Sequence, residues 1–182
     1  SLAQIEATAD RILAEIGIEF REDPEVVALF RAAGARVTDL AADSWNLKFE
    51  PGMIRQILST APQRFTQVAR NPANNVEIGG DAMVFAPSYG SPFVMDLDKG
   101  RRYGTIADFE NFVKLAQMSP NLHHSGGTIC EPTDVAVNKR HLDMVYAHMR
   151  YSDRAFLGSI TAPARAEDSI EMCRILFGAE FV

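Results

Sequence analysis

The alternation of apolar and polar residues divides the chain at about residue 80, and short patterns fill the first part. The first helical face has its apolar positions at Ile5, Ile12, Leu13 and Ile16. Gly17 provides an end for that helix, Asp23 before Pro24 predicts the start of a second, and Pro51 opens a third. Extended patterns occur at "IEFR", "WNLKF", "FTQVAR" and "NVEIGG". We expect residues 1–80 to form a small mixed α+β module.

From about residue 81 an extended pattern and a helical pattern alternate three times. The strand candidates are "AMVFAPS", "NLHHSGGT" and "RAFLGSI". The predicted helices begin at Thr105, whose spacing to Asp108 is typical of a capping box, at Asp134, and after Thr161. A hairpin turning at 98–100 precedes the first helix. Alternating units of this kind predict a parallel sheet covered by helices, with ligands at the carboxyl ends of the strands.

The number of units limits the choice of fold. Three units are too few to close an eight-stranded barrel, and doubly wound sheets usually have more strands. The last residues, Phe181 and Val182, are typical of the start of a fourth strand. We therefore expect an α/β fold in which residues 81–182 are the first three βα units of a TIM barrel. On this interpretation the chain is a fragment of a longer protein.

Composition and charge narrow the function. Hydrophobic residues make up 47% of the 182 residues and charged residues 23%, which is typical of a globular protein. The net charge of −6, without a basic run, argues against a nucleic-acid partner. Apolar runs are far shorter than the roughly 20 residues that cross a bilayer, and no signal-peptide pattern opens the chain. We expect a cytoplasmic protein with Cys130 and Cys173 reduced.

A succession of segments carries a resemblance to a known family. The segments "AEIGIEF", "DPEVVALFRAAGARV" and "FEPGMIRQILSTAPQRFTQVARNP" resemble the trimethylamine methyltransferase family. So do "VEIGGDAMVFAPSYGSPFVMDLDKGRR" and "TIADFENFVKLAQMSPNL" further along. The resemblance covers essentially the whole chain in order, and it depends on the succession of these pieces because none is a signature alone.

The resemblance implies a TIM-barrel enzyme that transfers a methyl group from trimethylamine, glycine betaine or a similar compound. The acceptor would be the Co(I) of a cobamide carried by a separate corrinoid protein, and no cofactor would be bound covalently. Some members use pyrrolysine, at a position outside this chain, and many relatives without it act on betaines. We expect a betaine-type relative. The oligomeric state stays open, a homo-oligomer included.

Tyr89 is the first candidate for substrate binding. It stands alone among proline, serine and glycine after the first strand candidate. A quaternary ammonium has no N–H to donate, and aromatic faces hold it through cation–π contacts of about 0.5–2 kcal/mol each. The alternative is packing of the ring against a neighbouring loop. Phe93, at the start of the next apolar run, is interpreted as core.

The second strand candidate and its loop supply His124, Thr128 and Glu131. The neighbouring His123 and His124 face opposite sides of a strand, so one of them could face a barrel interior and bind a carboxylate. The alternative, which we favour, is one packed and one hydrogen-bonded histidine. Thr128 and Glu131 follow two glycines that allow close backbone approach, although Glu131 also suits a helix start.

Ser159 and Thr161 end the third strand candidate and could supply hydroxyls to a substrate; Thr161 could instead cap the next helix. No residue is assigned as catalytic. A zinc site from Cys130, Glu131 and the two histidines matches no familiar spacing, so we expect no metal. A Cys130 nucleophile is a further alternative. Two other functions stay open: a metal-assisted hydrolase with a TIM barrel, and a betaine-binding module without catalysis.

Overall fold

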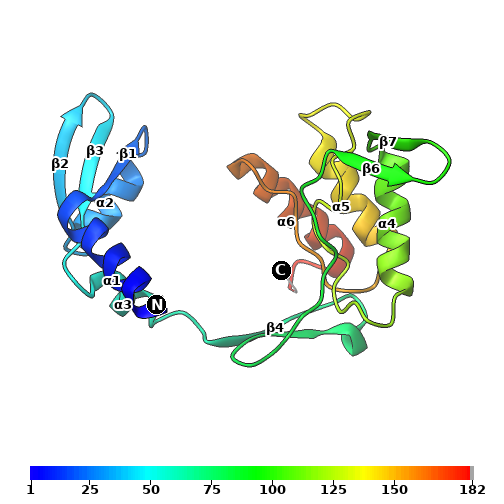
Figure 1. The fold of residues 1–182 in the computed structure, drawn as a ribbon, viewed down its shortest axis with the longest axis horizontal. Helices are drawn as coiled ribbons and strands as arrows, with labels where there is room; N and C mark the ends of the chain where they lie inside the picture. Colours follow the sequence, from blue (N-terminus) through cyan, green and yellow to red (C-terminus); the bar gives the residue numbers. More distant parts are fainter. Residues whose placement is uncertain (181–182) are drawn as a thin grey trace. The chain divides into compact units, whose positions relative to one another are not determined.

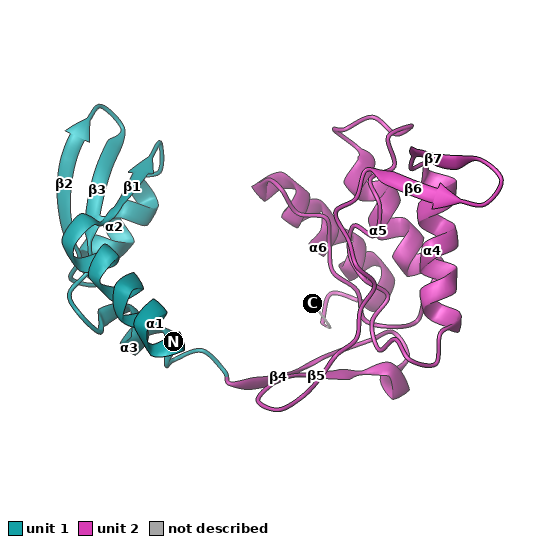
Figure 2. Ribbon diagram, viewed as in Figure 1, with its two compact units in different colours: residues 1–62 teal, residues 63–182 magenta. Residues whose placement is uncertain are grey.

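The computed structural model describes residues 1–180 and divides the chain into two compact units (Figure 2). Unit 1 covers Ser1–Pro62 and unit 2 covers Gln63–Val182. Both mix helices with small antiparallel sheets, which confirms the α/β class in its coarse form. No closed barrel forms within residues 1–180. The functional division expected at residue 80 stays a prediction.

Unit 1 is a three-stranded sheet with three helices (Figure 1). The elements in order are α1 (Leu2–Arg11), a π-helical turn (Ile12–Ile16), β1 (Ile18–Arg21), α2 (Pro24–Ala32), β2 (Arg36–Ala41), β3 (Ser44–Lys48) and α3 (Met53–Leu58). The strand order is β1-β3-β2, and both pairings are antiparallel. The sequence pattern does not predict strand β2. Only Val37 on this strand is partly buried, so the strand lacks an apolar face and is held by backbone pairing to β3.

The predicted helix boundaries in unit 1 have clear local causes. The Asp23 carboxylate accepts a hydrogen bond of 3.0 Å from the Val26 N–H, so the predicted N-cap is confirmed. Gly17 ends the first helical stretch at φ 86°, in the left-handed region, and a Cβ there would lie 2.4 Å from the Leu47 carbonyl oxygen. Only glycine therefore fits this stop.

The core of unit 1 is apolar and aromatic. Its buried members are Val27, Ala35, Leu47 and Phe49. The Phe30 ring lies 5.7 Å from the Phe20 ring and 5.2 Å from the Phe49 ring, distances at which tilted aromatic pairs stabilise each other. Residues of the helices and of the sheet thus share one apolar core in unit 1.

Unit 2 consists of two hairpins, three helices and long extended segments (Figure 1). The first hairpin is β4 (Arg64–Gln67) with β5 (Val76–Gly79), joined through a 3₁₀ turn (Pro72–Asn74), and the second is β6 (Phe93–Asp96) with β7 (Gly100–Tyr103). The helices are α4 (Ile106–Met118), α5 (Arg140–Tyr151) and α6 (Pro163–Phe177), and α5 packs between the other two. In the part of the chain that the structure describes, no helix is long and apolar enough to cross a membrane.

The three predicted strands of unit 2 are present as neighbouring extended segments, 84–90, 122–130 and 154–160. The backbone N–H groups of His123 and His124 both donate to the Phe85 carbonyl, and Ser125 N–H donates to the Ala155 carbonyl. The bridges Ser91 to Cys130 and His124 to Ala155 are parallel. The segments therefore lie side by side in sequence order and run in one direction.

These segments are not regular strands, which corrects the expectation of continuous parallel pairing. Phe85 N–H donates to the His123 side chain at 3.0 Å instead of to a neighbouring carbonyl. Pro87 has no N–H to donate, and Gly126 is left-handed at φ 94°. Side-chain and glycine chemistry thus interrupt the ladder that the apolar pattern predicts.

Local chemistry also sets the helices of unit 2. The capping box of Thr105 and Asp108 at α4 is confirmed, as is the hairpin turn before it. The helix predicted from Asp134 begins only at Arg140, and the Asp134 carboxylate accepts instead from the N–H of Ile106, the first residue of α4, at 2.9 Å. Residues 134–139 form turns.

Candidate functional site

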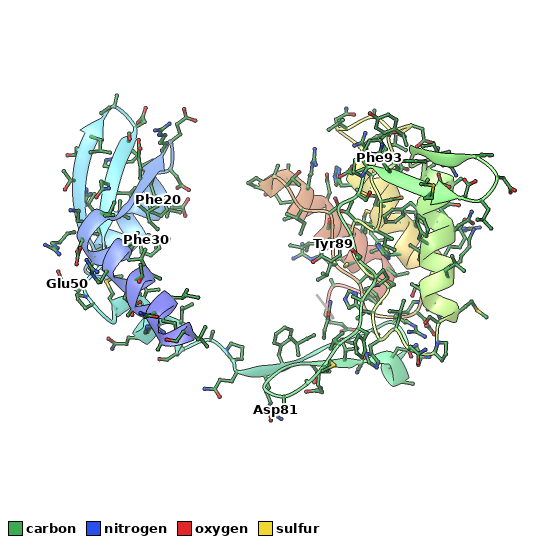
Figure 3. The ribbon with its side chains drawn as sticks, in the orientation of Figure 1. Phe20, Phe30, Glu50, Asp81, Tyr89 and Phe93 are labelled. Carbon is green, nitrogen blue, oxygen red and sulfur yellow. The ribbon has the colours of Figure 1, made fainter. Side chains whose placement is uncertain are left out.

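The carboxyl ends of the extended segments bring together three of the predicted residues. The Thr128 hydroxyl donates to the Ser159 hydroxyl at 3.0 Å, and Gly90 N–H donates to the Thr128 carbonyl at 2.8 Å. Tyr89 directly precedes Gly90, and 59% of its surface is exposed. Figure 3 marks Tyr89 on the stretch that leads to Phe93 and β6. One end of unit 2 therefore carries an exposed tyrosine whose next residue is hydrogen-bonded to the backbone of Thr128, one of the two residues with linked hydroxyl groups.

A glycine pair lets the first two segments approach closely. Gly126 has φ 94°, and a Cβ there would lie 3.3 Å from Pro87 Cδ and 3.1 Å from Ile129 Cγ1. The Gly126 carbonyl accepts from Leu157 N–H at 2.9 Å, which links the same loop to the third segment. The close approach at the two glycines is thus toward Pro87 and Ile129 at Gly126 and toward Leu157 at Gly127, residues of this chain itself.

Both neighbouring histidines accept backbone hydrogen bonds. His124 is buried, and its Nδ1 accepts from Gly126 N–H at 2.9 Å; burial lowers the pKa of this imidazole. The neutral ring then carries its proton on Nε2. His123 is exposed, and its ring stacks on Phe85 with 5.6 Å between the centroids. The favoured alternative, a packed and a hydrogen-bonded histidine, agrees with these contacts.

Glu131 and Thr161 each face an arginine. The Glu131 carboxylate accepts from Arg140 Nη1 at 2.8 Å, and Arg140 also donates to the Val135 carbonyl, so this pair fixes the start of α5. The Thr161 hydroxyl accepts from Arg165 Nη1 on the first turn of α6. Among residues 1–180, no hydrogen bond joins either side chain to the hydroxyl pair. Thr161 does not cap α6, because the N-cap is Ala162.

The environment of Cys130 bears on the thiol and zinc alternatives. The side chain is buried, and burial, with smaller contributions from nearby carboxylates, raises the pKa of the thiol to about 11. It is therefore protonated at neutral pH, whereas the thiolate is the nucleophile and the metal ligand. Within the described residues, no three His, Cys, Asp or Glu side chains are grouped so as to hold a metal ion.

Sequence reasoning missed a buried polar side chain that binds the loop of the second segment, His148 on α5. Its Nδ1 lies 2.9 Å from the Ser125 hydroxyl, and its Nε2 lies 2.9 Å from the Gly127 carbonyl. Burial lowers the pKa of this imidazole to about 4. His148 follows His141 by seven residues, a spacing that places both on one face of α5 but does not indicate which segment this face contacts.

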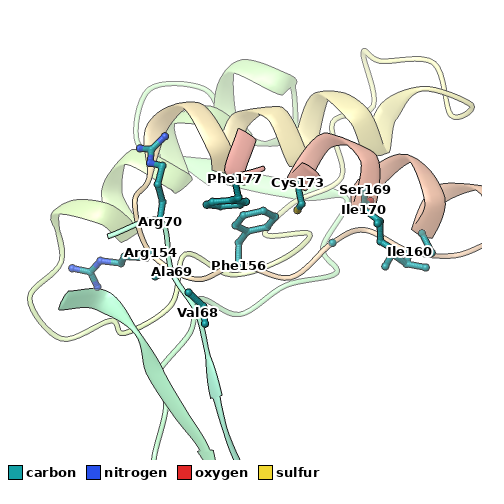
Figure 4. A pocket seen from close by; sticks show the side chains of 12 residues that line it. Val68, Ala69, Arg70, Arg154, Phe156, Ile160, Ser169, Ile170, Cys173 and Phe177 are labelled. Carbon is teal, nitrogen blue, oxygen red and sulfur yellow. The ribbon is translucent and has the colours of Figure 1, made fainter. Parts of the chain in front are cut away.

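An apolar pocket of about 290 Å³ lies elsewhere in unit 2, between α6 and the third extended segment (Figure 4). Its lining includes Val68, Phe156, Ile160, Ile170, Cys173 and Phe177. Phe156, Gly158 and Ile160 line it, while the intervening Ser159 binds Thr128. None of the six predicted site residues is part of its lining, so the pocket and the candidate site are on different faces of the segment.

Comparison with known proteins identifies the family. A family model described as trimethylamine methyltransferase (MTTB) matches residues 1–182, and the chain belongs to this family. It is also 46% identical over 172 residues to the glycine betaine methyltransferase of Desulfitobacterium hafniense (strain Y51). That match covers 94% of this chain and 35% of the relative, so the chain spans about a third of the relative's length. The resemblance found in the sequence is confirmed.

Proposed function

We propose that the protein containing this chain is a methyltransferase that takes a methyl group from glycine betaine or a similar quaternary ammonium. The observation that carries the proposal is the 46% identity to a glycine betaine methyltransferase over 94% of the chain. The match to the family over residues 1–182 supports the same class of reaction. The acceptor is the Co(I) of a cobamide on a separate corrinoid protein.

The proposed architecture for residues 81–182 is the first part of a TIM barrel. Two observations support it: the three extended segments run parallel in sequence order, and the helix side chain of His148 contacts Ser125 and Phe156 from one side. Thr128 and Ser159 then belong to the opposite, inner face, at the carboxyl ends where barrel enzymes bind substrates. The β4–β5 hairpin lies at the amino ends (Figure 1).

The candidate site suits a betaine for chemical reasons. The exposed Tyr89 ring offers its negative face to the trimethylammonium group. The Thr128 hydroxyl donates to Ser159, so the linked pair offers one free O–H, that of Ser159, to the carboxylate. In this proposal His124 fixes the loop through Gly126 and does not touch the substrate, and Glu131 and Thr161 are secondary candidates because each has an arginine partner.

In the proposed reaction one C–N bond of the ammonium breaks and its electron pair stays on nitrogen, which leaves as a neutral tertiary amine. The methyl group passes to Co(I), whose electron pair forms the new bond. The residues of this chain bind the cation and aim one methyl group outward to the acceptor. A cytoplasmic location stays a prediction.

The test is methyl transfer by the full-length protein to free cob(I)alamin. We expect glycine betaine to yield methylcobalamin and dimethylglycine in equal amounts, followed by absorbance and by mass spectrometry. Trimethylamine and other methylated amines form the comparison panel. A full-length protein that transfers no methyl group from any of them would contradict the proposal, and tight betaine binding without transfer would indicate a binding module instead.

A further inference from the structure

His148 contacts the residue before the glycine pair of the second extended segment and the second glycine of that pair. The imidazole Nε2 lies 2.9 Å from the Gly127 carbonyl, and Nδ1 lies 2.9 Å from the Ser125 hydroxyl. Because a carbonyl only accepts, Nε2 carries the proton and donates, and Nδ1 accepts from the hydroxyl. One neutral tautomer therefore satisfies both contacts.

The ring itself has no freedom to turn. His148 is 1% exposed, its ring stacks on Phe156 at 5.5 Å with 5° between the planes, and the Phe109 ring meets it edge-on at 5.3 Å. Phe109 belongs to α4 and Phe156 to the third extended segment. The imidazole is thus packed against α4 and the third extended segment while it is hydrogen-bonded to the loop at Gly127.

The loop that His148 holds leads directly to the candidate site. The Gly127 carbonyl precedes Thr128, whose hydroxyl binds Ser159 and whose carbonyl accepts from Gly90 N–H next to Tyr89. We propose that His148 is a positioning residue for the substrate site: by binding the Gly127 carbonyl it fixes the backbone that carries Thr128. This inference rests on the proposed function, in which the hydroxyl pair of Thr128 and Ser159 contacts substrate.

Two substitutions separate the two hydrogen bonds of His148. The amide of His148→Gln reaches the position of Nε2 and can donate to the Gly127 carbonyl, whereas the shorter amide of His148→Asn reaches only the position of Nδ1 beside Ser125. In the full-length protein we expect His148→Asn to raise KM for glycine betaine roughly 10-fold, with kcat on free cob(I)alamin within about 2-fold. His148→Gln should stay within about 3-fold of wild type in KM.

His141 provides the matched control. It is also a buried histidine on α5, 3% exposed, but its Nε2 faces the Asp168 carboxylate at 2.7 Å and not the loop. His141→Asn should lower thermal stability and leave KM unchanged. A merely structural role for His148 would make the two asparagine variants alike in KM as well as in stability.

The outcomes distinguish this inference from the proposed function. Equal KM values for His148→Asn and His148→Gln, with an active wild type, would overturn the positioning role alone. A wild type that transfers no methyl group would overturn the function, and the positioning role would fall with its substrate. Should His148→Asn fail to fold, Ser125→Ala must leave KM within about 2-fold, because the proposal assigns the positioning to the Gly127 bond.

Discussion

The two units of the chain are stabilised by different chemistry. Unit 1 has an apolar core packed against its antiparallel sheet, and Leu47 and Phe49 are among the buried residues of that core. The interior of unit 2 contains apolar clusters, but it also buries His124, Ser125, His141 and His148. All four histidines of the chain lie in unit 2, and the one tryptophan, Trp45, lies in unit 1. Two of these side chains, His124 and His148, hydrogen-bond the backbone at Gly126 and Gly127.

The buried hydrogen-bonded histidines of unit 2 indicate that the functional site lies in this unit. Apolar packing tolerates changes of similar volume and specifies shape only. A buried histidine that bonds two backbone or side-chain groups fixes particular atoms, and it costs stability wherever those bonds are not made. Unit 2 uses such groups next to its exposed tyrosine and hydroxyl pair, which supports the assignment of the site to that unit.

Truncation of the unit 1 core has the largest expected effect. Leu47 is 0% exposed, so Leu47→Ala should lower the free energy of unfolding of unit 1 by about 2–5 kcal/mol. Trp45 fluorescence during urea unfolding measures this directly. The control is Leu40→Ala on β2, where the side chain is 55% exposed and the expected change is within about 0.5 kcal/mol. Equal losses in the two variants would contradict the apolar account of unit 1.

Acidification should destabilise unit 2 before unit 1, whereas Leu47→Ala destabilises unit 1. Burial lowers the pKa of His148 from 6.5 to about 4, so between these values the unfolded chain binds a proton that the folded chain does not. The contribution of neutral His148 to the free energy of unfolding is fully present above pH 6.5. It is lost as the pH is lowered toward 4, by about 3 kcal/mol in total. The lowered pKa of His124 acts in the same direction. Unit 2 should therefore weaken first.

Unit 1 provides the internal reference for this pH effect. Hydrogen bonds from Arg21 and Ser44 lower the pKa of Glu19 to about 2. The stabilisation of unit 1 by the ionised Glu19 carboxylate is therefore lost only as the pH falls below about 4.5. Hydrogen exchange of α4 amides, corrected for intrinsic rates, should show lost protection at pH 5, while the Trp45 unfolding midpoint stays constant. A parallel shift of both signals would contradict the difference between the units.

The glycine that joins the segments should tolerate substitution less well than an exposed one. Gly126 and Gly90 are both left-handed, at φ 94° and 97°, but only Gly126 has neighbours within 4 Å of a built Cβ. Gly90→Ala should cost about 1 kcal/mol from backbone strain, and Gly126→Ala roughly 2 kcal/mol because Pro87 and Ile129 must also shift. Thermal unfolding followed by circular dichroism measures both, and the reverse order would show that contact with Pro87 is unimportant.

Local signals predicted most of the helices and the hairpin of β6 and β7. The Asp23 cap, the Thr105 and Asp108 box and the turn at 98–100 depend on neighbours in sequence, and all are confirmed. The direction of the three segments followed from their alternation with helices. Their irregularity did not, because it depends on long-range bonds such as Phe85 N–H to His123.

The candidate site could be predicted from the sequence only in part, for the same reason. Tyr89 was singled out as a ring in a turn, and Thr128 and Ser159 as polar groups at strand ends, all of which are properties of local sequence. Sequence spacing gave no indication that Glu131 would pair with Arg140 or that His148 would bind Gly127, because tertiary packing creates those contacts. The structure supplies this second group, and the substrate contacts stay predictions.

Removal of the Tyr89 ring has the smallest expected effect. It tests most directly the central claim that this ring binds the substrate cation. Glycine betaine and 3,3-dimethylbutanoate share shape and carboxylate, but only the betaine is cationic. The full-length protein should prefer the betaine, Tyr89→Phe should retain this preference, and Tyr89→Leu should lose about 0.5–2 kcal/mol of it by calorimetry. Tyr146→Leu, on the exposed surface of α5, should change nothing. An unchanged preference in Tyr89→Leu would contradict the assignment of the substrate cation to Tyr89.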